Sequence, residues 1–338
     1  MRAGSAVAVT GAAGFVGSHV VDSLVAEGSS VVACDNLRAG KWSNLDAHGG
    51  VVTRVELDVR DAAAVDALVA EHDLTSIVHL AANADVPASV NDPAYDHDTN
   101  AGGTFAVLDA VRRLSPTTRV VVASSAAVYG TPRSLPIDEN APLAPISPYG
   151  ASKVAADAMA RAFKETYGVQ AVIARIFNTY GPRMPRYVVV DFLHKLQRDP
   201  HHLEIIGTGR QLRDLSYVSD TAAGLLTLVD GGEPGEAYNV CTGKSHTVTD
   251  VAKTMIDLLG LDAELSFTGV SWPGDVEEFE GDPRKLSALG HRASVSLSEG
   301  LAHVIEWFEA TFGPVACGRR PPVAATAPTT LDDARGRA

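Results

Sequence analysis

The sequence predicts a parallel, doubly wound α/β sheet followed by a smaller α/β region. Short apolar runs alternate with helical patterns between residues 7 and 176. The helical stretches between successive runs are long enough to act as crossover connections, which parallel strands require. A glycine-rich turn follows the first run, and the alternation becomes less regular after residue 177. These observations favour one large sheet with helices on both faces and a second, smaller region.

Composition and charge narrow the function classes. The chain has 338 residues, of which 46% are hydrophobic and 20% charged, so a large core is expected. The net charge of −13 and the lack of a Lys/Arg run argue against a nucleic-acid partner. The chain shows neither a signal-like segment nor a long apolar run, so we expect a cytoplasmic protein without a membrane partner. Cys34, Cys241 and Cys317 are far apart, which indicates reduced thiols and no metal site.

The first apolar run, residues 7–10, ends in the turn Gly11-Ala12-Ala13-Gly14-Phe15-Val16-Gly17, and a helical pattern follows. Glycines at this spacing let the backbone turn tightly and approach a pyrophosphate, while the helix N-terminus supplies N–H donors and a positive dipole. An ordinary strand–helix turn is the alternative. We expect a dinucleotide cofactor to contact Gly11, Gly14, Phe15, Val16 and Gly17.

Acidic and small residues end the next apolar runs. Asp35 follows Gly11 by 24 residues and ends the second run. A carboxylate there accepts a hydrogen bond from an adenosine ribose and repels a 2′-phosphate, so NAD is favoured over NADP. Asp58 ends the third run, where it would meet the adenine or cap the helix beginning near Asp61. The remaining predicted cofactor contacts are Asn36, Val59, Leu80, Ala81, Ala82 and Asn100, the last within the helices expected over 92–114.

Hydroxyl groups follow the fifth run, residues 119–123. Ser124 and Ser125 stand at its carboxyl end, where they could polarise a substrate oxygen, although a simple strand exit is the alternative. A proline-rich loop then leads to Tyr149 and Lys153, which four-residue spacing places on one helix face. A nearby ammonium group favours the phenolate, so Tyr149 could act as a base near neutral pH. The pair is a weak signal alone, and the upstream motifs strengthen it.

The remaining chain divides into interleaved parts. We predict a cofactor domain over 1–177, completed by residues 214–242, in which 238–240 form a seventh strand. Residues 178–213 and 243–312 are predicted to form a substrate-binding cap, with a loop over 177–183. From residue 313 to 338 the composition turns to Ala, Pro, Thr and Arg without periodicity, which indicates a flexible tail.

Several segments together carry a family resemblance: Thr10 to Gly17, His79-Leu80-Ala81-Ala82, Ser124 to Gly130, Tyr149 to Lys153, Arg175-Ile176-Phe177-Asn178 and Gln211-Leu212-Arg213-Asp214. Over residues 5 to 312 the chain resembles an extended short-chain dehydrogenase/reductase of the nucleotide-sugar epimerase/dehydratase group, and within it a UDP-sugar 4-epimerase. The resemblance implies a Rossmann-type sheet with an interleaved cap, and a homodimer built on helices near 92–114 and 148–168.

The resemblance also implies residue roles. Tyr149 would take the proton of a sugar hydroxyl while the C4 hydride passes to NAD, and Ser125 would hydrogen-bond the same oxygen. Lys153 would hold the nicotinamide ribose and lower the pKa of the tyrosine. Further substrate contacts would come from Ser124 beside Ser125, from Asn178 and Arg213 at the diphosphate, from Asp275 at the nucleoside ribose and from Phe279 at the sugar.

Two alanines narrow the reaction. The 4,6-dehydratases of this group carry Asp and Glu where this chain has Ala126 and Ala127, the decarboxylases carry Glu at the second position, and the epimerase-reductases carry Cys at the first. Alanine cannot transfer a proton, so 4-epimerisation is favoured, of UDP-glucose/UDP-galactose or UDP-glucuronate/UDP-galacturonate. A dehydratase, decarboxylase or keto-reductase using other groups is the alternative, as is a non-catalytic NAD sensor.

Two positions depart from the family pattern. Trp272 stands where many 4-epimerases have an arginine that clamps the diphosphate, and tryptophan cannot donate a bidentate charged pair. Arg183, Arg186 or Arg210 would have to replace it. Phe279 lies near the position that sets the size of the sugar pocket, where a bulky ring favours a plain hexose or hexuronic acid over an N-acetyl sugar. A core-packing role for Phe279 is equally compatible with the sequence.

Overall fold

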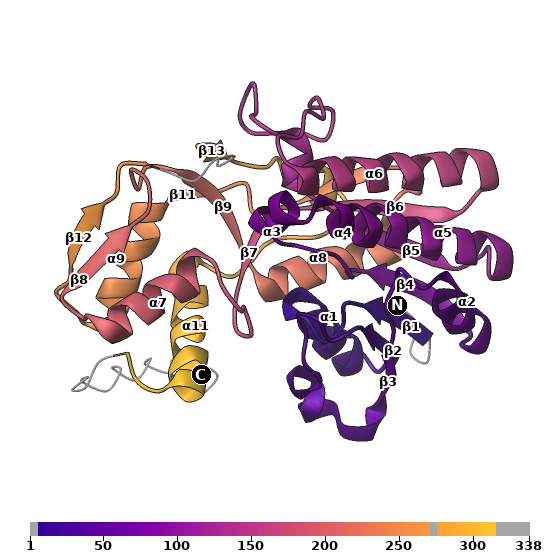
Figure 1. The fold of residues 1–338 in the computed structure, drawn as a ribbon, viewed down its shortest axis with the longest axis horizontal. Coiled ribbons are helices and arrows are strands. Elements are labelled where there is room, and N and C mark those ends of the chain that lie inside the picture. The colour runs from indigo at the N-terminus through magenta and orange to yellow at the C-terminus, as the bar shows by residue number, and fades with distance from the viewer. Residues whose placement is uncertain (1–5, 271–275, 316–338) are drawn as a thin grey trace, which may run out of the picture.

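The computed structural model describes residues 6–270 and 276–315. Its main sheet has seven parallel strands in the order β10-β6-β5-β4-β1-β2-β3 (Figure 1). This order reverses direction beside β1, as in a doubly wound sheet, so the predicted fold class is confirmed. The strands span Ala6–Thr10 (β1), Ser30–Asp35 (β2), Val52–Glu56 (β3), Leu74–His79 (β4), Arg119–Ser125 (β5), Gln170–Ile176 (β6) and Ala237–Val240 (β10).

Helices cover both faces of the main sheet, which explains why its strands are apolar on both sides. One core packs α2, α5 and α6 against the sheet, and a second core packs α1 and α8 on the other face. Short 3-10 turns, η1 (Trp42–Val51) and η3 (Ala126–Tyr129), follow β2 and β5. The helices span Phe15–Ala26 (α1), Ala62–Glu71 (α2), Gly103–Leu114 (α5), Pro148–Tyr167 (α6) and Val218–Gly231 (α8).

The seventh strand comes from beyond the cap, as the sequence predicted. β10 pairs with β6, with Ala237 opposite Ile173 and Val240 opposite Ile176. The short helix α10 (Arg284–Ser287) adds Leu286 to the same core as α8. The chain therefore leaves the main sheet after β6 and returns to complete its edge.

The cap lies beside the main sheet, with α7, α9 and α11 gathered at the left of Figure 1. β9 pairs with β7, β11 and β13, and β12 pairs with β8. The three helices share one apolar core with β8. The cap elements span Asn178–Tyr180 (β7), Val188–Arg198 (α7), His202–Ile205 (β8), Leu212–Tyr217 (β9), Ser245–Thr247 (β11), Val248–Leu259 (α9), Glu264–Phe267 (β12), Glu278–Phe279 (β13) and Leu297–Phe312 (α11).

One expectation about local structure is confirmed and one is wrong. Helices fill 92–114 as expected, in three pieces: α4 (Pro93–His97), a π-helical turn η2 (Asp98–Gly102) and α5, preceded by α3 (Val86–Asn91). Pro93 begins α4, and Asp92 caps it by accepting from the N–H of Tyr95 at 3.0 Å. The loop expected over 177–183 contains β7, which forms because β9 supplies a distant pairing partner.

A buried ion pair joins α6 to the main sheet. Arg175 of β6 donates from Nε to Asp157 of α6 at 2.9 Å, and both side chains are only 2% exposed. The Arg175 guanidinium also donates to the Tyr129 phenol oxygen at 3.0 Å. Tyr129 in turn donates to Asn239 of β10 at 2.6 Å. One polar chain therefore connects α6, β6, η3 and the late strand β10.

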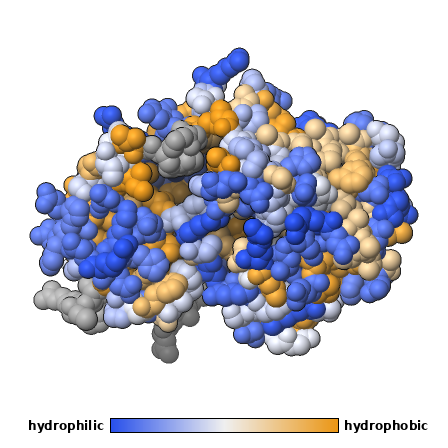
Figure 2. All heavy atoms as spheres, viewed as in Figure 1, coloured by the Kyte–Doolittle hydropathy of each residue, from blue (hydrophilic) through white to orange (hydrophobic). Residues whose placement is uncertain are grey.

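Polar and charged side chains cover much of the face shown in Figure 2, with apolar groups scattered among them. In the described residues, none of the helices combines the length and the apolar character needed to cross a lipid bilayer.

Replacing Arg175 by methionine is expected to lower the free energy of unfolding by about 3–5 kcal/mol, because Asp157 would stay buried without its cation. The urea midpoint measures this. The exposed Arg198→Met is the matched control and should change the midpoint little. The double variant Arg175→Met/Asp157→Leu should recover part of the loss. Equal midpoints for the Arg175 and Arg198 variants would contradict the role given to the pair.

Candidate active site

Ser125, Tyr149 and Lys153 meet at the carboxyl edge of the main sheet. Ser125 ends β5, and α6 begins directly before Tyr149 at Pro148. Ser147 caps α6 by accepting from the N–H of Gly150 at 3.1 Å, which fixes where the helix starts. Tyr149 and Lys153 are then 9% and 4% exposed. The structure therefore brings the three predicted catalytic residues together in a closed site.

The Tyr149 phenol lies against Ser125. Burial raises the pKa of Tyr149 to about 12, while a hydrogen bond with the Ser125 side chain acts in the opposite direction. The Tyr149 N–H donates to Ser89 Oγ at 3.1 Å, which ties the first turn of α6 to α3. A hydroxyl already paired with Ser125 marks the place where a substrate oxygen would meet both groups.

Lys153 is fully enclosed behind the tyrosine. Its Nζ donates to the carbonyl oxygen of Ala123 at 3.0 Å and lies 5.9 Å from the centre of the Tyr149 ring. Burial lowers the pKa of Lys153 to about 8, and Asp96 and Asp157 act in the opposite direction. The lowering of the Tyr149 pKa expected from Lys153 is not seen here: burial raises this pKa, and the opposing influence comes from Ser125.

The glycine turn has the shape of a phosphate cradle. Gly11 has φ +71°, and a Cβ there would lie 2.8 Å from the backbone N of Ala81. A Cβ on Gly17 would lie 2.1 Å from the Gly11 oxygen, so glycine is required at both positions. No side chain caps α1 at Gly14. The N-terminus of α1 therefore keeps its N–H groups and its positive dipole available, which fits the pyrophosphate of NAD.

Asp35 braces this cradle from β2. Its Oδ2 accepts from the N–H of Ala13 at 3.0 Å, and its Oδ1 accepts from the N–H of Leu37 at 2.8 Å. Burial raises the pKa of Asp35, and these N–H donors oppose that shift. The sequence did not predict this bracing role. Contact with the adenosine ribose remains a prediction.

Asn36 and Asp58 form the next part of the predicted cofactor site. Asn36 donates to Asp58 Oδ2 at 3.1 Å, and Arg60 donates to the same oxygen at 2.7 Å. These hydrogen bonds, from Arg60 above all, hold the pKa of Asp58 below its usual range. Asp58 is therefore an anionic acceptor at the strand edge, compatible with an adenine contact, and it does not cap α2, whose cap is Asp61.

The other predicted cofactor residues differ in exposure. Val59 is buried against the start of α5, where a Cβ on Gly103 would lie 2.6 Å from its Cγ2. Leu80, Ala81 and Ala82 are partly exposed at the end of β4. Asn100 is buried in η2 and donates to Ser152 Oγ at 3.0 Å, so it faces α6.

Ser124 points away from Ser125, because successive strand side chains alternate between the two faces. It is 3% exposed, and its hydroxyl lies close to Asp157. Its predicted contact with substrate would require a change of side-chain position. The structure favours Ser125 as the hydroxyl of the site.

The cap strands carry the predicted substrate residues. Asn178 is exposed at the start of β7, and Arg213 lies on the neighbouring strand β9, opposite Phe279 of β13. Phe279 is 8% exposed and packs edge-to-face on Phe177, with ring centres 6.0 Å apart. Phe279 therefore does pack in the core, as the alternative interpretation of this residue expected. Asp275 and Trp272 lie outside the described residues.

The arginines considered as phosphate clamps are placed differently. Arg183 donates to Asp22 and, through Nη1, to the Asn44 carbonyl oxygen at 3.0 Å. Arg186 forms an ion pair with Asp85. Arg210 is exposed between β8 and β9. Arg183 and Arg186 would have to leave existing partners to bind a phosphate, which favours Arg210.

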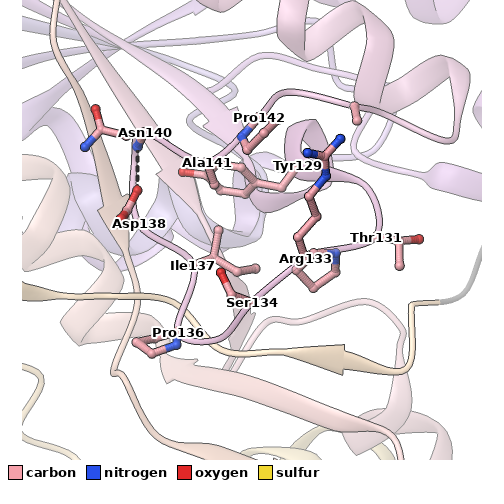
Figure 3. Close-up of a pocket in the computed structure, with 12 residues that line it drawn as sticks. Tyr129, Thr131, Arg133, Ser134, Pro136, Ile137, Asp138, Asn140, Ala141 and Pro142 are labelled. Carbon is pink, nitrogen blue, oxygen red and sulfur yellow. Dashed lines mark hydrogen bonds between the residues drawn. The ribbon is translucent and has the colours of Figure 1, made fainter.

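A cavity of about 250 Å³ lies within the loop between η3 and α6 (Figure 3). Asp138 accepts from the N–H of Asn140 at 2.8 Å along its wall. Its lining runs from Tyr129 to Ala144 and includes none of the three predicted catalytic side chains.

Sequence reasoning missed several residues that shape the site: Ser89, Asp96, Ser152, Asp157 and Tyr187. Asp157 had a signal, since it stands one helical turn after Lys153 and so shares its face. The phenol of Tyr187 donates to the Ala84 carbonyl oxygen at 2.8 Å, and Tyr187 is close enough to Tyr149 to influence its ionisation.

Comparison with known proteins agrees with this geometry. The family model described as GDP-mannose 4,6 dehydratase matches residues 8–304. The chain belongs to the nucleotide-sugar epimerase/dehydratase family of extended short-chain dehydrogenases/reductases. Within the family it is 33% identical to the UDP-glucose 4-epimerase of Mycolicibacterium smegmatis, over 89% of this chain and 97% of that one. It is 32% identical to a dTDP-glucose 4,6-dehydratase of an Actinoplanes species, over 90% and 98% respectively.

Solved structures of the family have the same fold. A UDP-glucose 4-epimerase of Thermotoga maritima, solved with UDP-glucose, superposes with a TM-score of 0.85 at 32% identity, covering 90% of this chain and 99% of that one. A UDP-glucose 4-epimerase of Thermus thermophilus, solved with NAD, gives a TM-score of 0.82 at 32% identity, with the same coverage. These matches establish the family of the chain. They do not establish its reaction, because both 4-epimerases and 4,6-dehydratases are among the relatives.

Tyr149→Phe should lower turnover by about 10²–10⁴-fold, because the acid/base hydroxyl is removed, while NAD stays bound at the glycine cradle. Turnover and NAD content of the purified variant measure the two effects. Tyr167→Phe, an exposed tyrosine at the far end of the same helix, is the matched control. Near-normal turnover by Tyr149→Phe would refute its role as the base.

Proposed function

We propose that this protein is an NAD-dependent 4-epimerase of a nucleoside-diphosphate sugar, either UDP-glucose/UDP-galactose or UDP-glucuronate/UDP-galacturonate. The observation that carries the proposal is the pair Ala126 and Ala127 beside Ser125. Ala126 belongs to an apolar cluster, and the Ala127 carbonyl packs against Gly150, where a Cβ would lie 2.7 Å away. Neither alanine can supply the second proton transfer that elimination or decarboxylation in this family uses, and the Tyr129 phenol at the end of η3 is hydrogen-bonded to Asn239 and Arg175.

Glu139, an acid on the loop that follows η3, is already engaged. Glu139 accepts from the N–H of Asn239 at 2.8 Å through Oε1, and burial raises its pKa. It braces β10 rather than standing free beside Ser125. This supports a reaction that needs one acid/base group only, because Tyr149 can take a proton and later return it to the same oxygen.

The protein's own residues have distinct tasks in such a reaction. Tyr149 accepts the proton of the C4 hydroxyl as that carbon is oxidised, and Ser125 donates a hydrogen bond to the oxygen. Lys153 keeps a positive charge behind the phenol. NAD held at the glycine cradle would supply the hydride acceptor for oxidation at C4 and the hydride donor for the reverse reduction. Atoms and electrons balance over the cycle, so substrate and product are isomers and no NAD is consumed.

The test is incubation of the protein with UDP-glucose, UDP-glucuronate and UDP-N-acetylglucosamine without added NAD. We expect C4 interconversion of the first or the second, and slower or no reaction of the third, because Phe279 and Phe177 close the space beside β9. Chromatography of the released sugars measures the outcome. A stable keto-sugar or pentose product would indicate the dehydratase or decarboxylase alternative. Tight NAD binding without turnover of any nucleotide sugar would indicate a sensor.

We also infer a homodimer formed through α5 and α6. Phe105 and Tyr167 are 50% and 54% exposed on these helices, and the Phe163 ring lies between them, with centres at 6.0 Å and 5.3 Å. This aromatic surface lies on adjacent helices, as a helical dimer interface requires.

Phe105→Glu is expected to convert the dimer to a monomer, because a charge would be buried at the interface. Sedimentation or light scattering measures the mass. Phe267→Glu, at a 46% exposed cap residue, is the control and should leave the mass unchanged. A monomeric unmodified protein would exclude the interface.

A further inference from the structure

The segment between β4 and α5 directs one acid inward. Asp85 and Asp92 cap α3 and α4 by accepting from backbone N–H groups. Asp96, in the last turn of α4, is instead fully buried and faces α6. Asp96 is thus a buried carboxylate of α4, and the proposed reaction does not use it directly.

Asp96 accepts three hydrogen bonds from neutral donors. Ser152 Oγ donates to its Oδ2 at 2.6 Å, and the amide groups of Asn83 and Asn100 donate to its Oδ1 at 3.0 and 3.1 Å. The Asn100 amide group also donates to Ser152 Oγ. A carboxylate suits this place because it only accepts, whereas an asparagine would turn an N–H₂ group toward one of the donors. These bonds tie α4, η2 and the end of β4 to the first turns of α6.

The charge of Asp96 has one evident counterpart. Within residues 6–270 and 276–315, Asp96 forms no salt bridge, whereas the other buried acid near Lys153, Asp157, is paired with Arg175 at 2.9 Å. Lys153 directly follows Ser152, and its ionisation responds to Asp96 first and Asp157 second, after burial. A buried charge without compensation is costly, so the Asp96 carboxylate favours the ammonium form of Lys153.

We propose that Asp96 is a positioning residue of the Tyr149–Lys153 pair: it anchors α6 through Ser152 and supplies the buried negative charge that keeps Lys153 an ammonium ion. The inference rests on the proposed use of this pair in catalysis. The proposed role of Asp96 also explains why the chain changes direction between α3 and α5. The turn at Pro93 and the π-helical turn η2 bring Asp96 and Asn100 onto the same side, toward Ser152.

The charge of Asp96 predicts the direction of a pH shift. The titratable groups around Lys153 come from three elements: His79 of β4, Asp96 of α4, and Tyr149 and Asp157 of α6. Burial, and then the charge of Lys153, lower the pKa of His79 to about 3, so it stays neutral. A nearby anion favours the protonated form of both Tyr149 and Lys153. Removing it should therefore lower both pKa values, and the pH profile of catalysis should move toward lower pH.

The experiment compares Asp96→Asn, Asp96→Glu and Asp98→Asn in the full-length protein with bound NAD. The measurement is kcat/KM against pH on the sugar that turns over. Asp96→Asn should lower the rate and shift both limbs by about one pH unit or more toward acid. Asp96→Glu keeps the charge but misplaces the acceptor, so it should lower the rate without a shift. Asp98→Asn, 66% exposed on the adjoining turn, should change neither.

A second readout needs no sugar. The tyrosinate absorbance of the NAD-bound protein is titrated, and the curve of a matched Tyr149→Phe protein is subtracted to isolate Tyr149. Asp96→Asn should shift this titration toward lower pH, and Asp98→Asn should not. If no nucleotide sugar reacts, the epimerase proposal fails while this titration still decides the role of Asp96.

Two outcomes overturn the proposal: an unmoved pH profile, or an unmoved titration, in a folded Asp96→Asn protein. If that variant does not fold, Ser152→Ala takes its place, because it removes the 2.6 Å bond and leaves the charge. It should lower kcat at least about tenfold, with NAD still bound and the pH profile unmoved. An unchanged kcat would show that the hydrogen bond between Ser152 and Asp96 does not position Tyr149 and Lys153.

Discussion

The burial of a charged lysine behind a phenol is the constraint on which the rest of the structure depends. Lys153 and Tyr149 lie in the first turns of α6, inside the site, where water stabilises neither of their charges. The protein meets this constraint with oriented partners on both sides: the Ala123 carbonyl from β5, and carboxylates from α4 and from α6 itself. Each partner is held by its own hydrogen bonds, so the site is rigid at the point where protons move.

This arrangement explains why the elements around α6 are irregular or tightly tied. The sheet must present Arg175 so that Asp157 is neutralised, and the chain between β4 and α5 must break so that Asp96 can face inward. Regular packing would have left one acid at the surface and the other without a cation. The proposed epimerisation is simple by comparison, since it would need one tyrosine hydroxyl, one serine and one ammonium group for a proton that leaves and returns.

The sequence predicted the parts that follow from local physics. Alternating apolar runs indicate strands buried on both faces. A glycine turn before a helix indicates a phosphate cradle, because glycine adopts φ +71° at Gly11 without steric cost and only glycine allows the close backbone approach at Gly17. What it did not predict depends on distant partners. Asp35 braces Ala13, β7 pairs with β9, and the Asp96 contacts join residues 56 positions apart along the chain. No window of sequence contains both sides of such an interaction.

The return of the chain to the main sheet has a consequence for synthesis. Until residues 237–240 exist, β6 has an open edge and Tyr129 lacks the Asn239 oxygen that accepts its hydrogen bond. A nascent chain that ends before β10 therefore holds an incomplete polar chain behind α6. Residues 1–177 lack one strand of the main sheet, and the pairing of β10 with β6 joins segments far apart in sequence, a kind of contact that slows folding. Insertions or truncations within the cap would consequently disturb the main sheet.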